Sequence, residues 1–208
     1  MLTLRCVAAL ALALGLTLSA CGESEDEAGR HDASAVQTAG NGDVFNDADV
    51  EFASQMIPHH AQAIQMVVLA EGRPLDPEVA ELADAVRAAQ APEVEQMVDW
   101  LTGWGEEVPE TSLDHSHAGH DVDEMSPVEG MDDMPGMMTT EEMQALADAP
   151  DAEFQDLWLE MMVRHHEGAI EMARTEAEHG HFKPAVALAE EIEAAQEAEL
   201  ETMQGLVS

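Results

Sequence analysis

Two short segments of the sequence, MIPHHAQAIQM and MVRHHEGAIEM, each place a methionine three residues before a pair of histidines. Imidazole nitrogen and thioether sulfur both bind metals, and together they suit copper, above all Cu(I), better than calcium or magnesium. Zinc is compatible with the histidines but does not call for methionine. Di-iron bundles carry Glu-x-x-His on two helices, whereas Met56 and Met162 stand at the glutamate positions here. The pattern therefore favours copper, as Cu(I), Cu(II) or both, over zinc or iron.

The two segments belong to a longer internal repeat. A shift of 106 residues superposes the first segment on the second without a gap, and it also superposes LADAVRAAQAPEVEQM on LAEEIEAAQEAELETM. In both copies apolar residues recur at spacings of three and four, the period of an amphipathic helix. One shift that holds through two successive helices indicates a repeated helical hairpin. Two hairpins predict an all-α four-helix bundle, with a disordered Met/His-rich linker crossing between them.

The repeat predicts that equivalent side chains lie on the buried faces of all four helices. Gln90 and Glu93 share the inner face of the second helix, and burying such groups without a partner costs on the order of several kcal/mol. A carboxylate or an amide there could accept a ring N–H and orient the other ring nitrogen toward a metal. The candidate metal residues in the bundle are His59, His60, His165, His166, Met56, Met162, Met66, Met172, Glu93, Glu199, Met97 and Met203.

Each of these side chains also has a purely structural interpretation. Methionine at helical spacing commonly fills a core, and a histidine on an apolar face can be a polar core residue. Adjacent histidines point about 100° apart on a helix. Because both stripes are apolar here, the sequence leaves open which of His59 and His60, or of His165 and His166, turns inward.

A second group of candidate ligands lies between the hairpins, where ten acidic residues and no basic one stand between Glu106 and Met138. Thioethers at Met-x-x-Met spacing in a flexible acidic chain could wrap one cation, with histidines taking the oxidised ion. The candidates are His115, His117, His120, Met131, Met134, Met137 and Met138. A low-complexity spacer is the alternative, and flexible methionines could also act as oxidant sinks.

The N-terminus has the pattern of an export signal. Arg5 precedes an apolar run that ends in Leu-Ser-Ala before Cys21, as in a bacterial lipobox. We therefore expect residues 1–20 to be a lipoprotein signal peptide and Cys21 to carry a lipid that anchors the protein to the outer face of a bacterial membrane. A plain secretory signal is the alternative. With Cys6 removed and Cys21 lipidated, no thiol remains for a disulfide or a cysteine-based metal site.

The rest of the chain divides by composition and helix signals. It comprises a flexible tether (21–44), a first hairpin (45–104), an acidic linker (105–138), and a short helix plus the second hairpin (139–208). Thr139 begins a capping-box sequence, and Pro92 is expected to kink the second helix. The net charge is −37, or −38 once Arg5 leaves with the signal. Such a field repels nucleic acid and attracts cations, although acidic surfaces also serve solubility.

The chain resembles the domain-of-unknown-function family 305 over about residues 45–208. The resemblance rests on FASQMIPHHAQAIQM, on GMMTTEEMQALADAPDAEFQDLWLEMMVRHHEGAIEMA, and on the AAQ-x-x-E-x-x-x-M half that follows each. Members of that family are exported, ferritin-like four-helix proteins, and some are associated with copper binding and copper tolerance. The resemblance implies metal-binding roles for His59, His60, His165 and His166, with Met56 and Met162 beside them.

Together these features predict a copper-handling lipoprotein outside the cytoplasm rather than an enzyme. Its partners would be metal ions, captured by the linker and the acidic surface, and other copper-handling envelope proteins; no nucleic-acid partner is expected. The sequence shows no recognisable nucleophile, phosphate-binding loop or oxyanion device. One alternative is a ferritin-like metal-dependent oxidoreductase that uses His59, His165, Glu93 and Glu199. Another is an envelope scaffold whose histidines form a polar core layer without metal.

Overall fold

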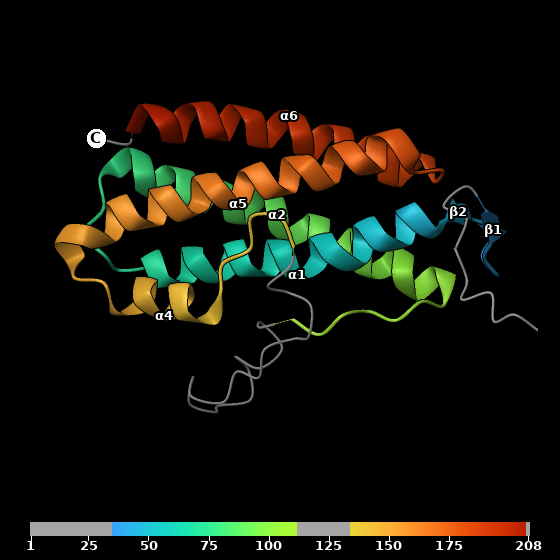
Figure 1. The fold of residues 1–208 in the computed structure, drawn as a ribbon, viewed down its shortest axis with the longest axis horizontal. Helices are drawn as coiled ribbons and strands as arrows, with labels where there is room; N and C mark the ends of the chain where they lie inside the picture. Colours follow the sequence, from blue (N-terminus) through green and yellow to red (C-terminus); the bar gives the residue numbers. More distant parts are fainter. Residues whose placement is uncertain (1–34, 112–133, 207–208) are drawn as a thin grey trace, which may run out of the picture. The chain divides into compact units, whose positions relative to one another are not determined.

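The computed structural model of the protein describes residues 35–111 and 134–206. In chain order these contain strands β1 (Val36–Thr38) and β2 (Val44–Asn46) and helices α1 (Asp47–Ala70), α2 (Pro77–Trp104), α4 (Thr140–Asp148), α5 (Asp151–His179) and α6 (Lys183–Leu206) (Figure 1). Helix α1 packs along α2 and α5 along α6, so each repeat is a helical hairpin. The hairpins meet where α1 packs on α5. The predicted four-helix bundle is therefore confirmed.

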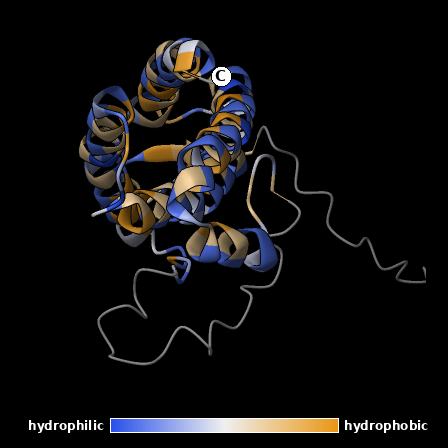
Figure 2. Cartoon of the chain, turned by 90° about the vertical axis from the view of Figure 1, so that its left-hand side faces the viewer, coloured by the Kyte–Doolittle hydropathy of each residue, from blue (hydrophilic) through white to orange (hydrophobic). Residues whose placement is uncertain are grey.

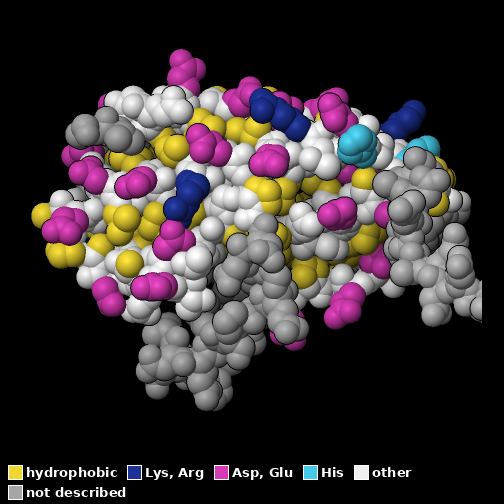
Figure 3. Space-filling model, viewed as in Figure 1, with side chains coloured by type: hydrophobic (Ala, Val, Ile, Leu, Met, Phe, Trp, Pro, Cys, Tyr) yellow, Lys and Arg dark blue, Asp and Glu magenta, His cyan; other side chains and the backbone are white. Residues whose placement is uncertain are grey.

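Burial in the bundle follows the hydrophobic pattern of the sequence. Seen from one end, the four long helices turn hydrophobic stretches toward one another and hydrophilic ones outward (Figure 2). The predicted inner face of the first helix, including Phe52, Met56 and Met66, is buried. Acidic side chains are spread over the outer face, among few basic ones (Figure 3). Among the helices of the described ranges, none combines the length and hydropathy that crossing a bilayer requires.

Capping residues fix where the helices begin. The Asn46 side chain accepts a hydrogen bond from the Asp49 backbone N–H, and the Asp49 carboxylate accepts one from the Asn46 N–H. This reciprocal pair satisfies donors that the first turn of α1 leaves free. The capping box predicted at Thr139 forms in the same way with Glu142 at the start of α4. Pro77 occupies the first position of α2, where its missing N–H costs no helical bond.

One local feature departs from the sequence-based expectations, and α1 and α2 each contain a proline. Residues 36–44 were assigned to a flexible tether, but β1 and β2 pair antiparallel, with Val36 opposite Asn46. Phe45 of β2 stacks on Trp104 at a centroid distance of 4.6 Å, which ties this hairpin to the bundle. Pro58 lies inside α1, and Pro92 lies inside α2, which continues to Trp104. Both helices run through their prolines because packing along the inner face outweighs the loss of one backbone hydrogen bond.

A buried carboxyl pair joins the start of α1 to the end of α5. Asp49 is fully buried, and its Oδ1 accepts hydrogen bonds of 2.9 Å from the backbone N–H groups of His181 and Phe182. Glu176 is 1 % exposed, and no donor in the described ranges bonds to its carboxyl oxygens. Burial, and then the adjacent Asp49 carboxylate, raise the pKa of Glu176 to about 9. Glu176 is therefore protonated at neutral pH.

We expect Glu176→Gln to make the protein less sensitive to alkaline pH. Unfolded Glu176 loses its proton near pH 4.5 and folded Glu176 near pH 9, so between these values the folded state binds more protons and its stability falls as pH rises. Glutamine has nearly the same size and shape as glutamic acid and cannot ionise. The free energy of unfolding of the variant should therefore exceed that of the wild type by a margin that grows with pH, by at most about 1.4 kcal/mol per pH unit.

Urea unfolding of both proteins at several values between about pH 5 and pH 8 measures this margin. Because the two proteins share every other titrating group, those contributions cancel in the difference. A margin that does not change with pH would show that Glu176 is not a buried, protonated carboxyl.

Candidate metal centre

A polar layer crosses the middle of the bundle and divides its apolar core in two. The layer consists of His59 and His60 on α1, Gln90 and Glu93 on α2, His165 and His166 on α5, and Gln196 and Glu199 on α6. On each of these helices, the buried apolar residues before the polar pair and those after it belong to different clusters. The internal repeat thus brings equivalent polar groups from all four helices to one level.

Two histidines of the layer are held by glutamates of the neighbouring helix. Nε2 of His60 lies 2.7 Å from Oε2 of Glu93, and Nε2 of His166 lies 2.7 Å from Oε2 of Glu199. Both histidines are fully buried, whereas the glutamate side chains are 19 % and 18 % exposed. In the neutral ring, Nε2 then donates to the carboxylate and Nδ1 keeps its lone pair. Carboxylates orient metal-binding imidazoles in this way.

The other two histidines face each other between α1 and α5. The ring centroids of His59 and His165 are 3.8 Å apart, and the ring planes are inclined by 39°. Nε2 of His59 lies 3.1 Å from the carbonyl oxygen of Pro135, to which it donates. Burial, reinforced by the neighbouring His60, lowers the pKa of His59 to about 3. Burial, followed by His59, also lowers the pKa of His165, so both rings are neutral at pH 7, as metal ligands must be.

Several polar atoms of the layer have no hydrogen-bond partner in the described part of the chain. They are Nδ1 of His59, His60, His165 and His166, Nε2 of His165, both amide heteroatoms of Gln90, and Oε1 of Gln196. A buried polar group left unsatisfied costs on the order of 1–3 kcal/mol, so a cluster of them points to a missing partner such as an ion or water. Imidazole nitrogens with free lone pairs are donor atoms for copper and zinc.

Methionine side chains flank the layer on both sides. Met56, Met97 and Met172 belong to one apolar cluster, and Met66, Met162 and Met203 belong to the other. The two sets are related position by position by the internal repeat, and all six side chains are buried. The structure therefore brings all the bundle residues expected to bind metal into the layer or into the clusters beside it. Metal binding by them stays a prediction.

The linker candidates divide into two groups. Met137 and Met138 are 8 % and 3 % exposed and pack on the bundle, and Met134 is partly buried, so the prediction of a disordered linker does not hold for residues 134–138. Their packing gives these methionines the structural role that composition alone did not suggest. The remaining candidates, His115, His117, His120 and Met131, lie outside the described residues, as does Cys21.

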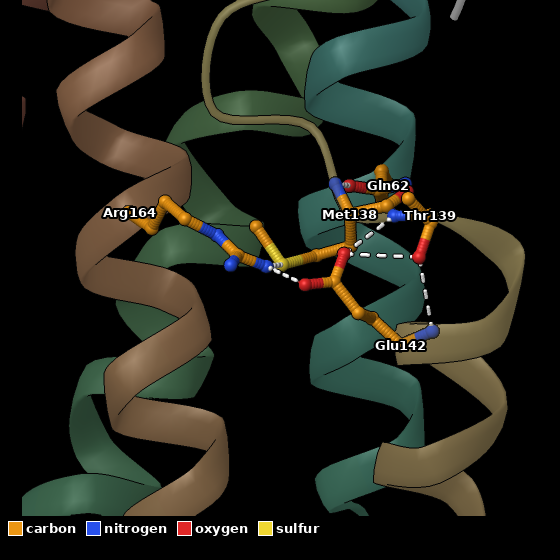
Figure 4. Close-up of polar contacts among 5 residues, drawn as sticks. All are labelled: Gln62, Met138, Thr139, Glu142 and Arg164. Carbon is orange, nitrogen blue, oxygen red and sulfur yellow. Dashed lines mark hydrogen bonds and ion pairs between the residues drawn. The ribbon is translucent and has the colours of Figure 1, made fainter. Parts of the chain in front are cut away.

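Residues 134–138 lie against both α1 and α5, and we call them the cover segment. Gln62 holds the backbone of Met138 with two hydrogen bonds, of 2.8 Å to its carbonyl oxygen and 2.7 Å from its N–H (Figure 4). Arg164 donates to the Met138 sulfur and to Glu142 (Figure 4). Sequence reasoning missed these residues because it looked for matches between the repeats. Positions at which the two repeats differ could have indicated them, since Gln62 of the first repeat is equivalent to Gly168 of the second.

Comparison with proteins of known structure places this bundle beside several relatives. A candidate secreted protein from Streptomyces coelicolor is 29 % identical, with a TM-score of 0.63, over 76 % of this chain and 89 % of that one. A protein fragment from Deinococcus radiodurans is 26 % identical, with a TM-score of 0.63, over 82 % and 98 %. The protein CopM in its Cu(II)-bound form is 27 % identical, with a TM-score of 0.60, over 76 % and 95 %.

Curated proteins give no significant match to the chain. The structures from Streptomyces coelicolor and Deinococcus radiodurans are both described as DUF305 proteins. The profile of the family described as "Domain of unknown function (DUF305)" matches residues 49–207, a range that contains the polar layer and all four long helices apart from the first two residues of α1. This protein therefore belongs to the DUF305 family.

Proposed function

We propose that this protein binds copper in the core of its bundle, outside the cytoplasm, and buffers the ion or hands it on. The observation that carries the proposal is the polar layer, in which four buried histidines have Nδ1 atoms without partners. Buried methionines flank the layer on both sides. Similarity to CopM, which has been crystallised with Cu(II), supports the choice of metal.

The donor set favours copper over harder ions. Among the described residues, no three histidine, cysteine, aspartate or glutamate side chains are grouped as a metal site. The buried methionines beside the layer would add thioether sulfur to its imidazoles, and this mixed set suits Cu(I). Glu93 and Glu199, which a ferritin-like oxidoreductase would use as ligands, are each engaged by a histidine. Their place beside the imidazoles favours a positioning role and makes the oxidoreductase the second candidate.

An extracytoplasmic location completes the proposal. It rests on the signal-like residues 1–20 and on the similarity to a candidate secreted protein. Lipid attachment at Cys21 would hold the acidic bundle at a membrane surface, where cations delivered from outside would meet it first. Handing copper to another envelope protein is part of the same proposal.

We expect the full chain to bind Cu(I) in preference to Zn(II) and Fe(II), and to lose its bundle-bound copper in the double variant His59→Ala/His165→Ala. Competition with a chromophoric Cu(I) chelator under anaerobic conditions measures stoichiometry and affinity. The same measurements are made on a chain that lacks residues 112–133. This deletion removes the linker histidines and Met131 but keeps the cover segment, so copper that remains bound is assigned to the bundle.

The control is Thr202→Ala, which removes one exposed hydroxyl on α6. Unchanged copper stoichiometry in the double variant of the shortened chain would falsify the bundle site. Preference for iron, with oxygen consumption, would instead support the oxidoreductase. Failure of every metal to bind tightly would leave the scaffold interpretation.

We expect Glu93→Gln and Glu199→Gln each to weaken Cu(I) binding by about tenfold while leaving the stoichiometry unchanged, because each glutamate orients a histidine. A carboxamide accepts a ring N–H less strongly than a carboxylate does, so the imidazole is held less firmly. The repeat predicts effects of similar size in the two variants. The same chelator competition measures the change, and X-ray absorption at the copper edge reports whether imidazole coordination persists.

Glu95→Gln and Glu201→Gln are matched controls, since they remove the same charge from exposed positions on the same two helices. Equal weakening in the controls would mean that the effect comes from lost surface charge. Loss of a whole equivalent of copper in Glu93→Gln or Glu199→Gln would make these residues ligands rather than positioning residues.

A further inference from the structure

The bundle gives the histidine pair between α1 and α5 no open path to solvent. His59 and His165 are fully buried, so an ion reaches them only if part of the protein moves. Helices α1 and α5 enclose the pair, and the cover segment contacts His59 through the Pro135 carbonyl oxygen. A segment without helical hydrogen bonds opens at a lower free-energy cost than a helix in a bundle. The cover segment is therefore the element whose displacement exposes His59 most readily.

A cavity of about 170 Å³ lies beside Pro135 and is lined by residues of α1 and α5. Its lining includes Glu51 and Gln55 of α1, Glu171, Thr175 and Glu176 of α5, and Pro135 itself. One water takes up about 30 Å³ in the liquid, so the cavity can admit a cation with several waters. Glu51 and Glu171 are exposed carboxylates that favour a cation at this position. Pro135 connects the cavity with the histidine pair, because it lines the cavity and its carbonyl oxygen contacts His59.

The cover segment is closely fitted to the helices beneath it. A Cβ added to Gly168 of α5 would lie 2.0 Å from the Pro135 carbonyl oxygen, so no side chain fits there. Gly136 has a φ of +75°, and a Cβ on it would lie 2.6 Å from the Arg164 carbonyl oxygen. The two hydrogen bonds from Gln62 complete the fit. This close fit holds the cover segment in one position. Only a few hydrogen bonds have to break before the segment can move away.

The residues that hold the cover segment are also places where the two repeats differ. Gln62, which binds Met138, is equivalent to Gly168, which makes room for Pro135. Arg164, which donates to Met138, is equivalent to Pro58. The histidines between these positions are identical in both copies. The two repeats are thus identical at the histidines of the polar layer and differ at the residues that contact the cover segment.

We propose that the cavity at Pro135 is the port through which a copper ion reaches His59 and His165, and that the cover segment is the gate of this port. The inference rests on the proposed function. Carboxylates at the cavity hold the arriving ion, the hydrogen bonds between Gln62 and Met138 open, and the cover segment moves away from α1 and α5. After the ion has passed, the segment closes over it, and Nε2 of His59 again donates to Pro135 while Nδ1 is free for the metal.

Two variants loosen the gate, and each has a matched control. Gln62→Ala removes both hydrogen bonds to Met138, and Gly168→Ala places a methyl group against the Pro135 carbonyl oxygen. Gln144→Ala removes an exposed glutamine contact on α4, and Gly205→Ala adds a methyl group where no atom lies within 4 Å. The full chain is used throughout, and urea unfolding shows that each variant is folded.

The first measurement needs no metal. Diethyl pyrocarbonate modifies accessible imidazoles, and peptide mass spectrometry gives separate rates for His59 and His166. We expect Gln62→Ala and Gly168→Ala to raise the rate at His59 by roughly tenfold, as the loss of two hydrogen bonds implies. The rate at His166, on the α6 side of α5, should stay at the wild-type value. Equal rises at both residues would mean general loosening of the bundle and would overturn the gate.

The second measurement is stopped-flow Cu(I) association, followed by dissociation into excess chelator. Both rates should rise by a similar factor in the two loosened variants, with the equilibrium affinity little changed and the controls unaffected. Unchanged rates in chains that bind copper at the bundle would overturn the port and point to a route past Glu93 or Glu199. Faster modification of His59 in a chain that binds no copper would instead support the opening of the segment and reject the proposed function.

Discussion

The structure depends on keeping a polar layer inside an apolar bundle. Four imidazoles, two amides and two partly exposed carboxylates occupy the same level of the four helices, where apolar side chains would pack at no desolvation cost. Part of that cost is offset by the 2.7 Å bonds from His60 to Glu93 and from His166 to Glu199. The desolvation cost of the nitrogens without partners is not offset by any described residue. The apolar clusters on either side must therefore stabilise the bundle enough to hold the layer in place.

The layer follows the internal repeat, but what covers it does not. His60 and His166 have equivalent partners, whereas His59 donates to Pro135 and His165 has no partner among the described residues. A chain that crosses once between two hairpins can lie on only one side of their pseudo-two-fold axis. The asymmetry of His59 and His165 therefore follows from the single crossover. The repeated hairpins supply equivalent candidate ligands. The described part of the segment that connects the hairpins accepts a hydrogen bond from His59 and not from His165, so the two histidines have different surroundings.

Helical periodicity and one constant shift were enough to predict the hairpins, their inner faces and the inward polar groups, because these features repeat along the chain. The question of which histidine turns inward was left open because both stripes are apolar, and the structure buries both. The contact of Pro135 with His59 could not be predicted, since it joins residues 76 positions apart and uses a backbone oxygen. The pairing of β1 with β2 was missed because two three-residue strands carry little pattern in a polar, Gly-rich stretch.

The same layer also bears on the charge of an ion that it could hold. The cost of moving an ion from water into a low-dielectric core grows with the square of its charge, so a monovalent ion is far cheaper to bury than a divalent one. His59 and His165 are neutral and supply no compensating charge. Glu93 and Glu199 do supply it, and they do so from positions that remain partly in contact with water. Their charge reaches the centre through His60 and His166, whose Nδ1 atoms become better donors when Nε2 is bonded to a carboxylate. Under the proposed function, low charge and ligand softness both favour Cu(I), which is monovalent and suited to imidazole and thioether.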